Sequence, residues 1–561
     1  MTALTIFPRI ALLPILSALL LAGVPAAAAP ANAAAPVTAT LTMRTPDSLE
    51  IAYALPPACK ALAFVNDGVK AQAAVHLRSD WTPADDCTAV DFQSVRPTRA
   101  SCRTLRLRVP ATTRAADTRV YGQAEPWAQP IGGGLYAHTS AYAVHGCGAV
   151  DWRFAAPGGT VMVDGTVAPE SVTRSSSAAH GGGLAAVLLH QPYRSDAPPF
   201  HAEDAVPPAT RAMLAATLDE SLGALRALLP GVHLTPAYVL AVPDDAPGLR
   251  AGVANGTVLR LLVPTQEPAD LREQARELIA HETAHLAQPP HWPAPPGEDA
   301  GALREGGAEF LRLAIALRQG WLTPDAFRDA LEAAVNGCAA AAGRQPWRAI
   351  EGRGKDPLAR RCGLALHVLA LSHPGPTPPL QRLQALYGKG GAQDPAGAAR
   401  ALECGDAAGC TPQLVTALRG VAPLRTVLED EMRRSGAVLT ATPAWGPQLT
   451  EAMTLHHLEL LVRADCHGRA GIYPNRKAPR IGPGLRCGVL RDGMVPATAE
   501  GLPLFAGPDA IAASRAACRT RGATTIGMRD GASVTVRCGQ AAGLEERVFG
   551  IDAERATQLV R

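Results

Sequence analysis

The segment HETAH places two histidines four residues apart, with a glutamate directly after the first; these residues are His281, Glu282 and His285. Because residues i and i+4 share one face of a helix, the two imidazoles point the same way and can bind one ion at about 2.0–2.1 Å, as tetrahedral zinc prefers. Glu282 would then lie beside the ion, where it can take a proton from an attacking water and pass it to a leaving amine. This spacing predicts a metal site for peptide-bond hydrolysis.

Two histidines need a third ligand, and Glu305 is the first candidate. It lies twenty residues after His285, in ALREGGAEFLRLAIALRQG, which has the pattern of a second helix. A helix–loop–helix arrangement would bring Glu305 across to the histidine pair. Glu309, one turn further, could accept a hydrogen bond from a ligand imidazole and fix its tautomer. We expect His281, His285 and Glu305 to bind Zn²⁺ and leave a fourth position open for water.

The alternative third ligand is His291, six residues after His285. That is the position of the third histidine in the metzincin pattern H-E-x-x-H-x-x-G-x-x-H. The pattern needs a glycine for a sharp backbone turn where this chain has Gln288, and the following Pro289 biases Gln288 towards an extended conformation. Glu305 is therefore preferred, and His291 is otherwise read as a loop histidine.

The surrounding residues predict the elements that must hold these side chains. PADLREQARELIAHETAHLAQ is typical of a helix that starts at Pro268 and ends at Pro289-Pro290. AYVLAV and TVLRLLV before it are typical of strands, and Asn255-Gly256 is a hairpin signal. Helical stretches follow as far as LRTVLEDEMRRSG. We expect one mostly helical catalytic domain over residues 184–440.

The flanking regions differ from this domain, so the predicted fold class is α+β with several domains. Residues 36–180 contain short alternating stretches such as LEIAYAL and LRLRV, broken by Pro, Gly and Asp, which predict an antiparallel β-sandwich-like domain. Residues 441–561 return to short strands and one helix, PDAIAASRAACRTRG, in a small disulfide-containing unit.

Residues 1–33 have the order of a secretory signal peptide. A short basic start precedes the 15-residue apolar run IALLPILSALLLAGV and the small-residue tail PAAAAPANAAAP. The apolar run is shorter than the roughly 20 residues needed to span a bilayer, so we expect no stable membrane insertion after cleavage. The mature protein is predicted to be exported, either periplasmic or secreted.

Cysteine usage and charge agree with an exported protein that does not bind nucleic acid. Twelve cysteines fall into three groups of four, which predicts disulfides within each domain, with Cys338–Cys362 and Cys404–Cys410 as neighbours in sequence. The formal net charge of +3 is spread along the chain, so no basic patch marks a nucleic-acid surface.

HETAH, the gap of about twenty residues and EGGAEF resemble the H-E-x-x-H…E-G-x-x-x-Y/F pattern of gluzincin zinc metallopeptidases. The layout is similar to the glycyl aminopeptidase family, which has an N-terminal β domain, a thermolysin-like catalytic domain and a C-terminal PDZ domain. The resemblance implies a peptide or protein substrate, Zn²⁺ on His281, His285 and Glu305, and Glu282 as general base. It also implies that TVLRLLV is the edge strand on which substrate lies and that residues 441–561 are PDZ-like.

Many gluzincins also carry a Tyr or His that stabilises the oxyanion of the tetrahedral intermediate. In aminopeptidases of this type the residue is a Tyr three positions before a Gly on a later helix. The closest segment here, LARRCGLALHVLAL, has Arg360 three positions before Gly363. Arg360, Arg361 and His367 are therefore the candidates, and the oxyanion residue is left open. An exported zinc peptidase is the leading hypothesis. The alternative is a gluzincin-like scaffold with little or no turnover that binds proteins, and the third is a metzincin-type peptidase that uses His291.

Overall fold

The structure is a computed structural model of the chain. It describes residues 35–65, 78–112, 128–175, 184–193, 199–235, 237–245, 248–254, 258–288, 299–343, 345–350, 356–373, 377–388, 394–405, 407, 409–435, 443–467, 471–473, 478–482, 486–544 and 547–561. The predicted signal peptide, the Asn255-Gly256 turn and His291 lie outside the described residues.

The N-terminal domain consists of two β-sheets that share one apolar core. Alternate residues of its long strands are buried, as the sequence pattern predicts. The larger sheet has the order β4-β7-β2-β1-β11-β13-β9-β8, with β12 paired to β11. These strands are β1 (Val37–Thr45), β2 (Ser48–Ala54), β4 (Thr82–Pro83), β7 (Thr104–Pro110), β8 (Ala128–Ile131), β9 (Gly134–His138), β11 (Val150–Val163), β12 (Thr166–Ser175) and β13 (Ala185–Leu189).

The smaller sheet of this domain has the order β10-β3-β6-β5, and Leu62, Phe64 and Val95 from it enter the shared core. Its strands are β3 (Leu62–Phe64), β5 (Thr88–Val90), β6 (Ser94–Pro97) and β10 (Val144–His145). Pairing is antiparallel throughout both sheets, except that β1 and β11 run parallel. β13 pairs with β11 and β9, so the first domain extends past residue 180, where the sequence pattern put its end.

A four-stranded central sheet follows, in the order β14-β15-β17-β16. Its strands are β14 (Phe200–Ala202), β15 (Tyr238–Asp244), β16 (Arg250–Ala254) and β17 (Val258–Pro264). The prediction that TVLRLLV forms the edge of the sheet is wrong, because β17 lies between β15 and β16. β16 folds back antiparallel on β17 and takes the edge position itself.

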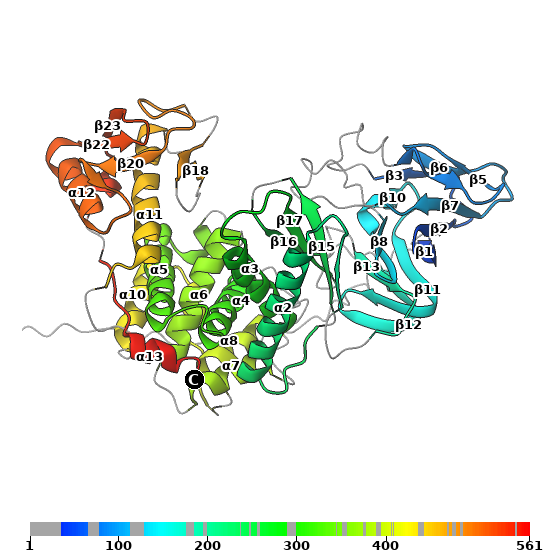
Figure 1. The fold of residues 1–561 in the computed structure, drawn as a ribbon, viewed down its shortest axis with the longest axis horizontal. Helices are drawn as coiled ribbons and strands as arrows, with labels where there is room; N and C mark the ends of the chain where they lie inside the picture. Colours follow the sequence, from blue (N-terminus) through cyan, green and yellow to red (C-terminus); the bar gives the residue numbers. More distant parts are fainter. Residues whose placement is uncertain are drawn as a thin grey trace, which may run out of the picture.

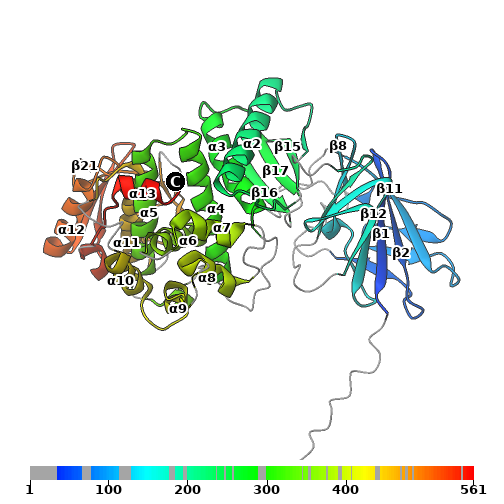
Figure 2. The same ribbon diagram turned by 90° about the horizontal axis from the view of Figure 1, so that it is seen from below.

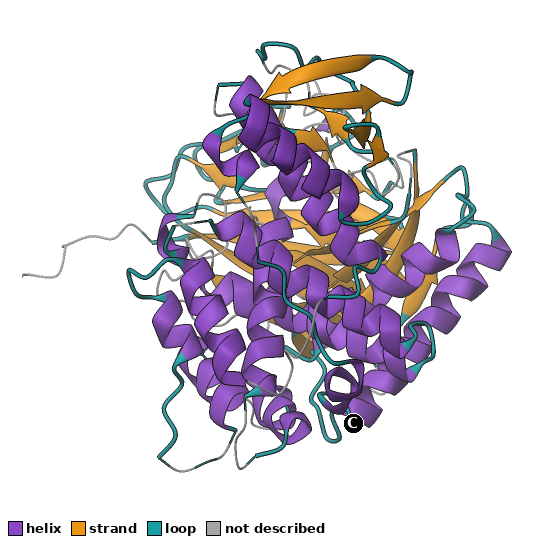
Figure 3. Ribbon diagram, turned by 90° about the vertical axis from the view of Figure 1, so that its left-hand side faces the viewer, coloured by secondary structure: helices purple, strands orange, loops and turns teal. Residues whose placement is uncertain are grey.

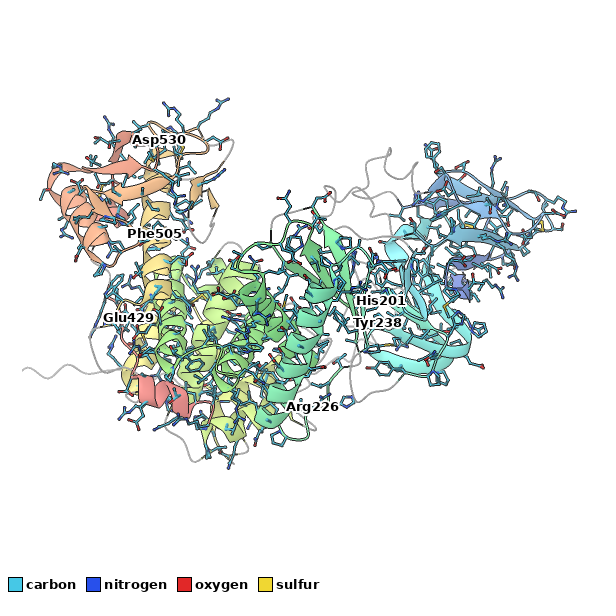
Figure 4. The ribbon with its side chains drawn as sticks, viewed as in Figure 1. His201, Arg226, Tyr238, Glu429, Phe505 and Asp530 are labelled. Atoms are coloured by element: carbon cyan, nitrogen blue, oxygen red, sulfur yellow. A yellow bond between two sulfur atoms is a disulfide. The ribbon has the colours of Figure 1, made fainter. Side chains whose placement is uncertain are left out.

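The central sheet is buried on both faces, which explains why every residue of β17 is buried. One face packs against α2 (Pro208–Leu228) and α3 (Leu271–Leu286) through Leu218, Ala275 and Ile279. The other face packs against the first domain through Tyr136 and Tyr238, and Figure 4 shows Tyr238 at this junction. The sheet therefore forms a firm base for α3.

Most of the remaining helices form one bundle beside α3, which dominates the view in Figure 3. They are α4 (Asp299–Arg318), α5 (Pro324–Ala342), α6 (Asp356–Ser372), α7 (Pro379–Tyr387), α8 (Pro395–Cys404), α9 (Leu414–Leu418) and α10 (Leu424–Ser435). The described short 3₁₀ helices of the chain are η2 (Thr139–Ala141), η3 (Trp347–Ala349) and η4 (Gln540–Gly543).

Helices α4 and α6 cross at two glycines. A Cβ on Gly306 would lie 2.0 Å from the carbonyl carbon of Gly363, and a Cβ on Gly363 would lie 1.9 Å from the carbonyl oxygen of Ala302. Real Cβ contacts are never this short, so the two backbones touch directly. The Cys338–Cys362 disulfide ties α5 to α6 beside this crossing.

The long helix α11 (Pro447–Asp465) joins the bundle to the C-terminal unit. Leu449 and Met453 pack with residues of α5, whereas Leu458, Leu461 and Val462 enter the core of the C-terminal unit. Figures 1 and 2 show the result as a row, with the N-terminal domain at one end and the C-terminal unit at the other. The expected boundary at residue 441 therefore precedes a helix that belongs to both parts.

The C-terminal unit contains a four-stranded antiparallel sheet in the order β21-β20-β22-β23, with α12 against it. Its elements are β18 (Ile472–Tyr473), β19 (Arg480–Ile481), β20 (Pro496–Ala499), β21 (Leu502–Pro503), α12 (Asp509–Arg521), β22 (Ala523–Met528) and β23 (Ser533–Arg537). The order of strand, turn, helix and two closing strands agrees with the sequence, while a PDZ-like identity stays a prediction.

The chain then leaves this unit and returns to the bundle. The backbone N–H of Phe549 donates to the side-chain oxygen of Asn336 (2.8 Å), and the N–H of Ile551 donates to the Glu332 carboxylate (2.8 Å). Helix α13 (Ala553–Gln558) packs against α5. Residues 549–560 thus belong to the bundle and not to the unit at 441–561 in which the sequence pattern placed them.

All twelve cysteines are paired within their predicted groups, in six disulfides. The two neighbouring pairs expected from the sequence, Cys338–Cys362 and Cys404–Cys410, are both present. The described helices include none that is long and apolar enough to cross a membrane.

The glycine crossing gives a first prediction. In Gly306→Ala the new methyl group would collide with the backbone of Gly363, so we expect an unfolding midpoint lowered by the equivalent of about 1–3 kcal/mol or more. Gly223→Ala in α2 is the matched control, because a Cβ there meets nothing within 4 Å; this variant should be stabilised slightly. Urea unfolding followed by circular dichroism measures both, and equal effects would contradict the crossing.

Candidate metal centre

Helix α3 presents the two histidines to the bundle while its other face is fixed on the central sheet. Ala275, Ile279 and Leu286 recur at helical spacing and are buried in the core beneath the sheet. α3 begins at Leu271, three residues after the predicted start, because the Leu271 N–H bonds to the Pro268 carbonyl in a turn. His281 and His285 are both on its last two turns.

Glu305 of α4 meets the two imidazoles. Its Oε2 atom lies 3.5 Å from Nε2 of His281 and 3.6 Å from Nε2 of His285, and the two Nε2 atoms are 3.2 Å apart. A tetrahedron with bonds of about 2.1 Å has edges of about 3.4 Å, so these three atoms form a face of the size that zinc needs. The structure brings together the three residues that the sequence singled out.

Hydrogen bonds on the far side of each ring indicate which nitrogen carries the proton. Nδ1 of His281 lies 3.1 Å from the Glu309 carboxylate, which can only accept. Nδ1 of His285 lies 2.8 Å from Oε1 of Gln288, whose Nε2 donates to the carbonyl of Arg304. Both Nδ1 atoms therefore donate. The two Nε2 lone pairs and a carboxylate oxygen converge on one point, and this donor set fits a divalent cation.

Charges around the three candidate ligands His281, His285 and Glu305, here called the cage, also favour a bound cation. Burial opposes ionisation of Glu305, but contacts with His281 and His285 outweigh it and lower the pKa of that carboxyl. Burial lowers the pKa of His281, whereas Glu305 and Glu309 raise it, and the net direction is upward. The cage thus attracts a positive charge, and a proton on His281 competes with a metal ion for it.

Glu309 is itself held by Arg312, one turn along α4. Nε of Arg312 donates to Oε2 of Glu309 at 3.0 Å and an Nη atom donates to Oε1 at 2.6 Å. Burial raises the pKa of Glu309, but the guanidinium and His281 outweigh burial, so that the pKa is lowered. Glu309 therefore stays ionised and keeps accepting from the His281 ring.

Glu282 is buried, with 7% of its surface exposed, next to the cage. No hydrogen-bond or ion-pair partner contacts its carboxylate among the described residues, whereas Glu305 and Glu309 are both held. The arrangement leaves Glu282 able to accept a proton.

The three oxyanion candidates lie in different places. Nε of Arg360 is 3.5 Å from Oε2 of Glu305, so Arg360 borders the cage. Arg361 points towards α5, where its Cδ would lie 2.9 Å from a Cβ on Gly337. His367 is fully buried behind α4, and burial lowers its pKa to about 4 despite its bond to the Gly363 carbonyl. Only Arg360 among these three reaches the cage.

A cavity of about 350 Å³ opens beside His281. It is bounded by the exposed side of α3 and by residues of α4 and α6. Its lining residues are Leu249, Asp270, Gln274, Glu277, Leu278, His281, Glu309, Arg312 and Arg360. The cavity is polar and holds both signs of charge, and it offers room for part of a substrate next to the cage.

Gln288, Arg312 and Tyr387 contribute to this centre and were not expected from the sequence. Arg312 follows Glu309 by three residues on α4, a spacing that places this pair on one helical face. Gln288 follows His285 by three residues across the turn that ends α3. Both spacings could be read from the sequence. Tyr387 belongs to α7 and forms a side-chain hydrogen bond with Gln288. The two residues lie far apart in the sequence, so no local pattern predicts this contact.

Comparisons with known proteins found similarity in structure only. No protein-family model matches the chain, and no curated protein matches its sequence. An aminopeptidase N family protein from Idiomarina loihiensis is 11% identical, with a TM-score of 0.46 over 94% of this chain and 100% of that one. Native yeast LTA4 hydrolase is 11% identical, with a TM-score of 0.34 over 76% and 72% of the two chains. Both TM-scores lie below 0.5.

The ion pair between Glu309 and Arg312 predicts how stability depends on pH. The pKa of Glu309 is lowered from its ordinary value of 4.5 by folding, so its stabilising effect is complete above that value and is lost as the pH falls below it. Metal-free wild type should therefore exceed Glu309→Gln in urea midpoint at pH 7 and lose this advantage towards pH 3. A difference that does not vary with pH would contradict the ion pair.

Proposed function

We propose that the protein is an exported zinc-dependent peptidase of the gluzincin type. The observation that carries this proposal is the three-atom face made by His281, His285 and Glu305, with edges of 3.2–3.6 Å. Glu282 beside it supplies the general base that peptide hydrolysis needs. The six disulfides support export, because disulfides persist in oxidising compartments.

In this mechanism, Zn²⁺ bound by His281, His285 and Glu305 would supply a Lewis acid that polarises the substrate carbonyl and acidifies water. Glu282 accepts the proton as the water oxygen bonds to the carbonyl carbon. The C–N bond then breaks, and Glu282 returns the proton to the leaving amine. The charge-assisted bond from His281 to Glu309 holds the ligand ring in place during these steps.

Arg360 is our proposed oxyanion group. It borders both the cage and the cavity, and its side chain is 35% exposed, so it can face a substrate. A guanidinium that meets developing negative charge in such a site contributes several kcal/mol to the rate. It occupies the position where the resembled family carries a tyrosine.

The metal ligands are tested by zinc content. We expect about one zinc per chain in the purified wild type, and loss of that zinc in His281→Ala and in Glu305→Ala. His291→Ala should keep it, as should the control Glu273→Ala, which alters an exposed glutamate of α3. Inductively coupled plasma mass spectrometry gives the stoichiometry. Loss of zinc in His291→Ala, with zinc retained in Glu305→Ala, would instead support the metzincin-type site.

The general base is tested by activity. Glu282→Gln keeps the size of the side chain but cannot accept the proton, so cleavage of an unstructured protein should fall by about 100-fold or more. Its zinc content should equal that of the wild type. Equal, background-level cleavage by both zinc-loaded proteins would rule out the peptidase and leave a scaffold that binds proteins.

A further inference from the structure

Three buried side chains, Gln288, Tyr387 and His367, connect His285 to the crossing of α4 and α6. His367 lies 2.8 Å from the carbonyl of Gly363 through Nδ1 and 3.2 Å from the hydroxyl of Tyr387 through Nε2. Tyr387 also forms a side-chain hydrogen bond with Gln288, which in turn lies 2.8 Å from Nδ1 of His285. All three intermediate side chains are at most 3% exposed.

Hydrogen-bonding chemistry fixes which atom donates and which accepts in each of these contacts. The Gly363 carbonyl can only accept, so Nδ1 of His367 donates to it and Nε2 of the neutral ring must accept from the Tyr387 hydroxyl. Nε2 of Gln288 donates to the carbonyl of Arg304, so Oε1 of Gln288 is the atom that accepts from Nδ1–H of His285. Tyr387 forms its hydrogen bond with the same amide. A single orientation of each group satisfies the whole set, and it leaves Nε2 of His285 without a proton.

Gly307 makes room for these contacts. A Cβ at Gly307 would lie 1.9 Å from the Tyr387 hydroxyl, 3.0 Å from Nε2 of Gln288 and 3.1 Å from Nε2 of His367. The neighbouring Gly306 instead faces the backbone of Gly363. The two glycines of EGGAEF therefore have separate tasks, one in helix packing and one in the polar set.

We propose that Gln288, Tyr387 and His367 are positioning residues that lock His285 in its Nδ1–H tautomer and so set the affinity of the metal centre. This inference rests on the proposed metal site. It also makes the two histidine ligands unequal: His281 is held by the charged Glu309, whereas His285 is held by neutral groups anchored in the bundle.

The backbone near Gln288 is fixed separately from its side chain. The Gln288 N–H donates to the His285 carbonyl at 3.1 Å, and the Thr235 hydroxyl donates to the Gln288 carbonyl at 3.3 Å. The Thr235 N–H donates to the Leu286 carbonyl at 2.6 Å. Replacing the Gln288 side chain therefore leaves the end of α3 in place and removes only the bonds of that side chain, to Nδ1 of His285, to Tyr387 and to the Arg304 carbonyl.

The test uses the full chain and measures zinc affinity by competition with a chromophoric chelator, together with the visible spectrum of the Co²⁺-substituted protein. Gln288→Leu and Gly307→Ala should weaken zinc binding by about 10–100-fold, the range for partners of a ligand histidine, and should shift the Co²⁺ bands. Tyr387→Phe should act in the same direction, by about tenfold. The control Tyr53→Phe also removes a buried hydroxyl, one that donates to the Tyr142 carbonyl in the first domain, and should change neither readout.

A double variant adds a signature that general destabilisation does not produce. Removing the hydroxyl in Gly307→Ala/Tyr387→Phe relieves the shortest contact of the new methyl group, so its zinc affinity should match Tyr387→Phe rather than fall further. Wild-type affinity and an unchanged Co²⁺ spectrum in Gln288→Leu would overturn the proposal. If His281→Ala binds zinc as the wild type does, the metal site itself fails; if only His281→Ala loses zinc, the site stands and the positioning role fails.

Discussion

The direct contact between α4 and α6 at Gly306 and Gly363 is the constraint on which the centre depends. Glu305 immediately precedes one glycine and Arg360 lies three residues before the other, so the depth of the crossing decides where both side chains lie. A crossing even one methyl group wider would move the carboxylate of Glu305 away from α3. The central sheet fixes the opposite side by holding α3 through Ala275 and Ile279.

The electrostatic problem of the site is that two ring nitrogens and a carboxylate oxygen, all acceptors, meet within 3.6 Å. Such a group is unfavourable by itself and becomes favourable around a cation. The structure keeps the acceptors in place by occupying the opposite nitrogen of each ring, with Glu309 on His281 and Gln288 on His285. Packing and charge therefore act together, since the helices bring the ligands close and the outer hydrogen bonds orient them.

The part of the site that follows from local helical geometry could be predicted from the sequence. His281 and His285 share a face because they are four apart, and Glu305 was selected because a second helix begins after a suitable loop. The edge strand was assigned wrongly because the resemblance placed the substrate on β17, whereas the Asn255-Gly256 hairpin signal before β17 already indicated a strand paired with it, and β16 is that strand. Tyr387 and the return of residues 549–560 to α5 were missed because long-range contacts between buried elements leave no periodic signal. The sequence also suggested a domain boundary at residue 441, whereas α11 contributes apolar side chains to two different cores, one on each side of that boundary.

The return of the chain to the bundle has a consequence for biogenesis. Ile551, Ala556 and Leu559 are part of the same core as α4 and α6, yet the ribosome makes them after the whole C-terminal unit. Until they emerge, the carboxylate of Glu332 and the amide of Asn336 lack the backbone groups that they bind. The bundle therefore closes late, and a chain that was threaded through a translocation pore would acquire its finished core only after the C-terminal unit had crossed.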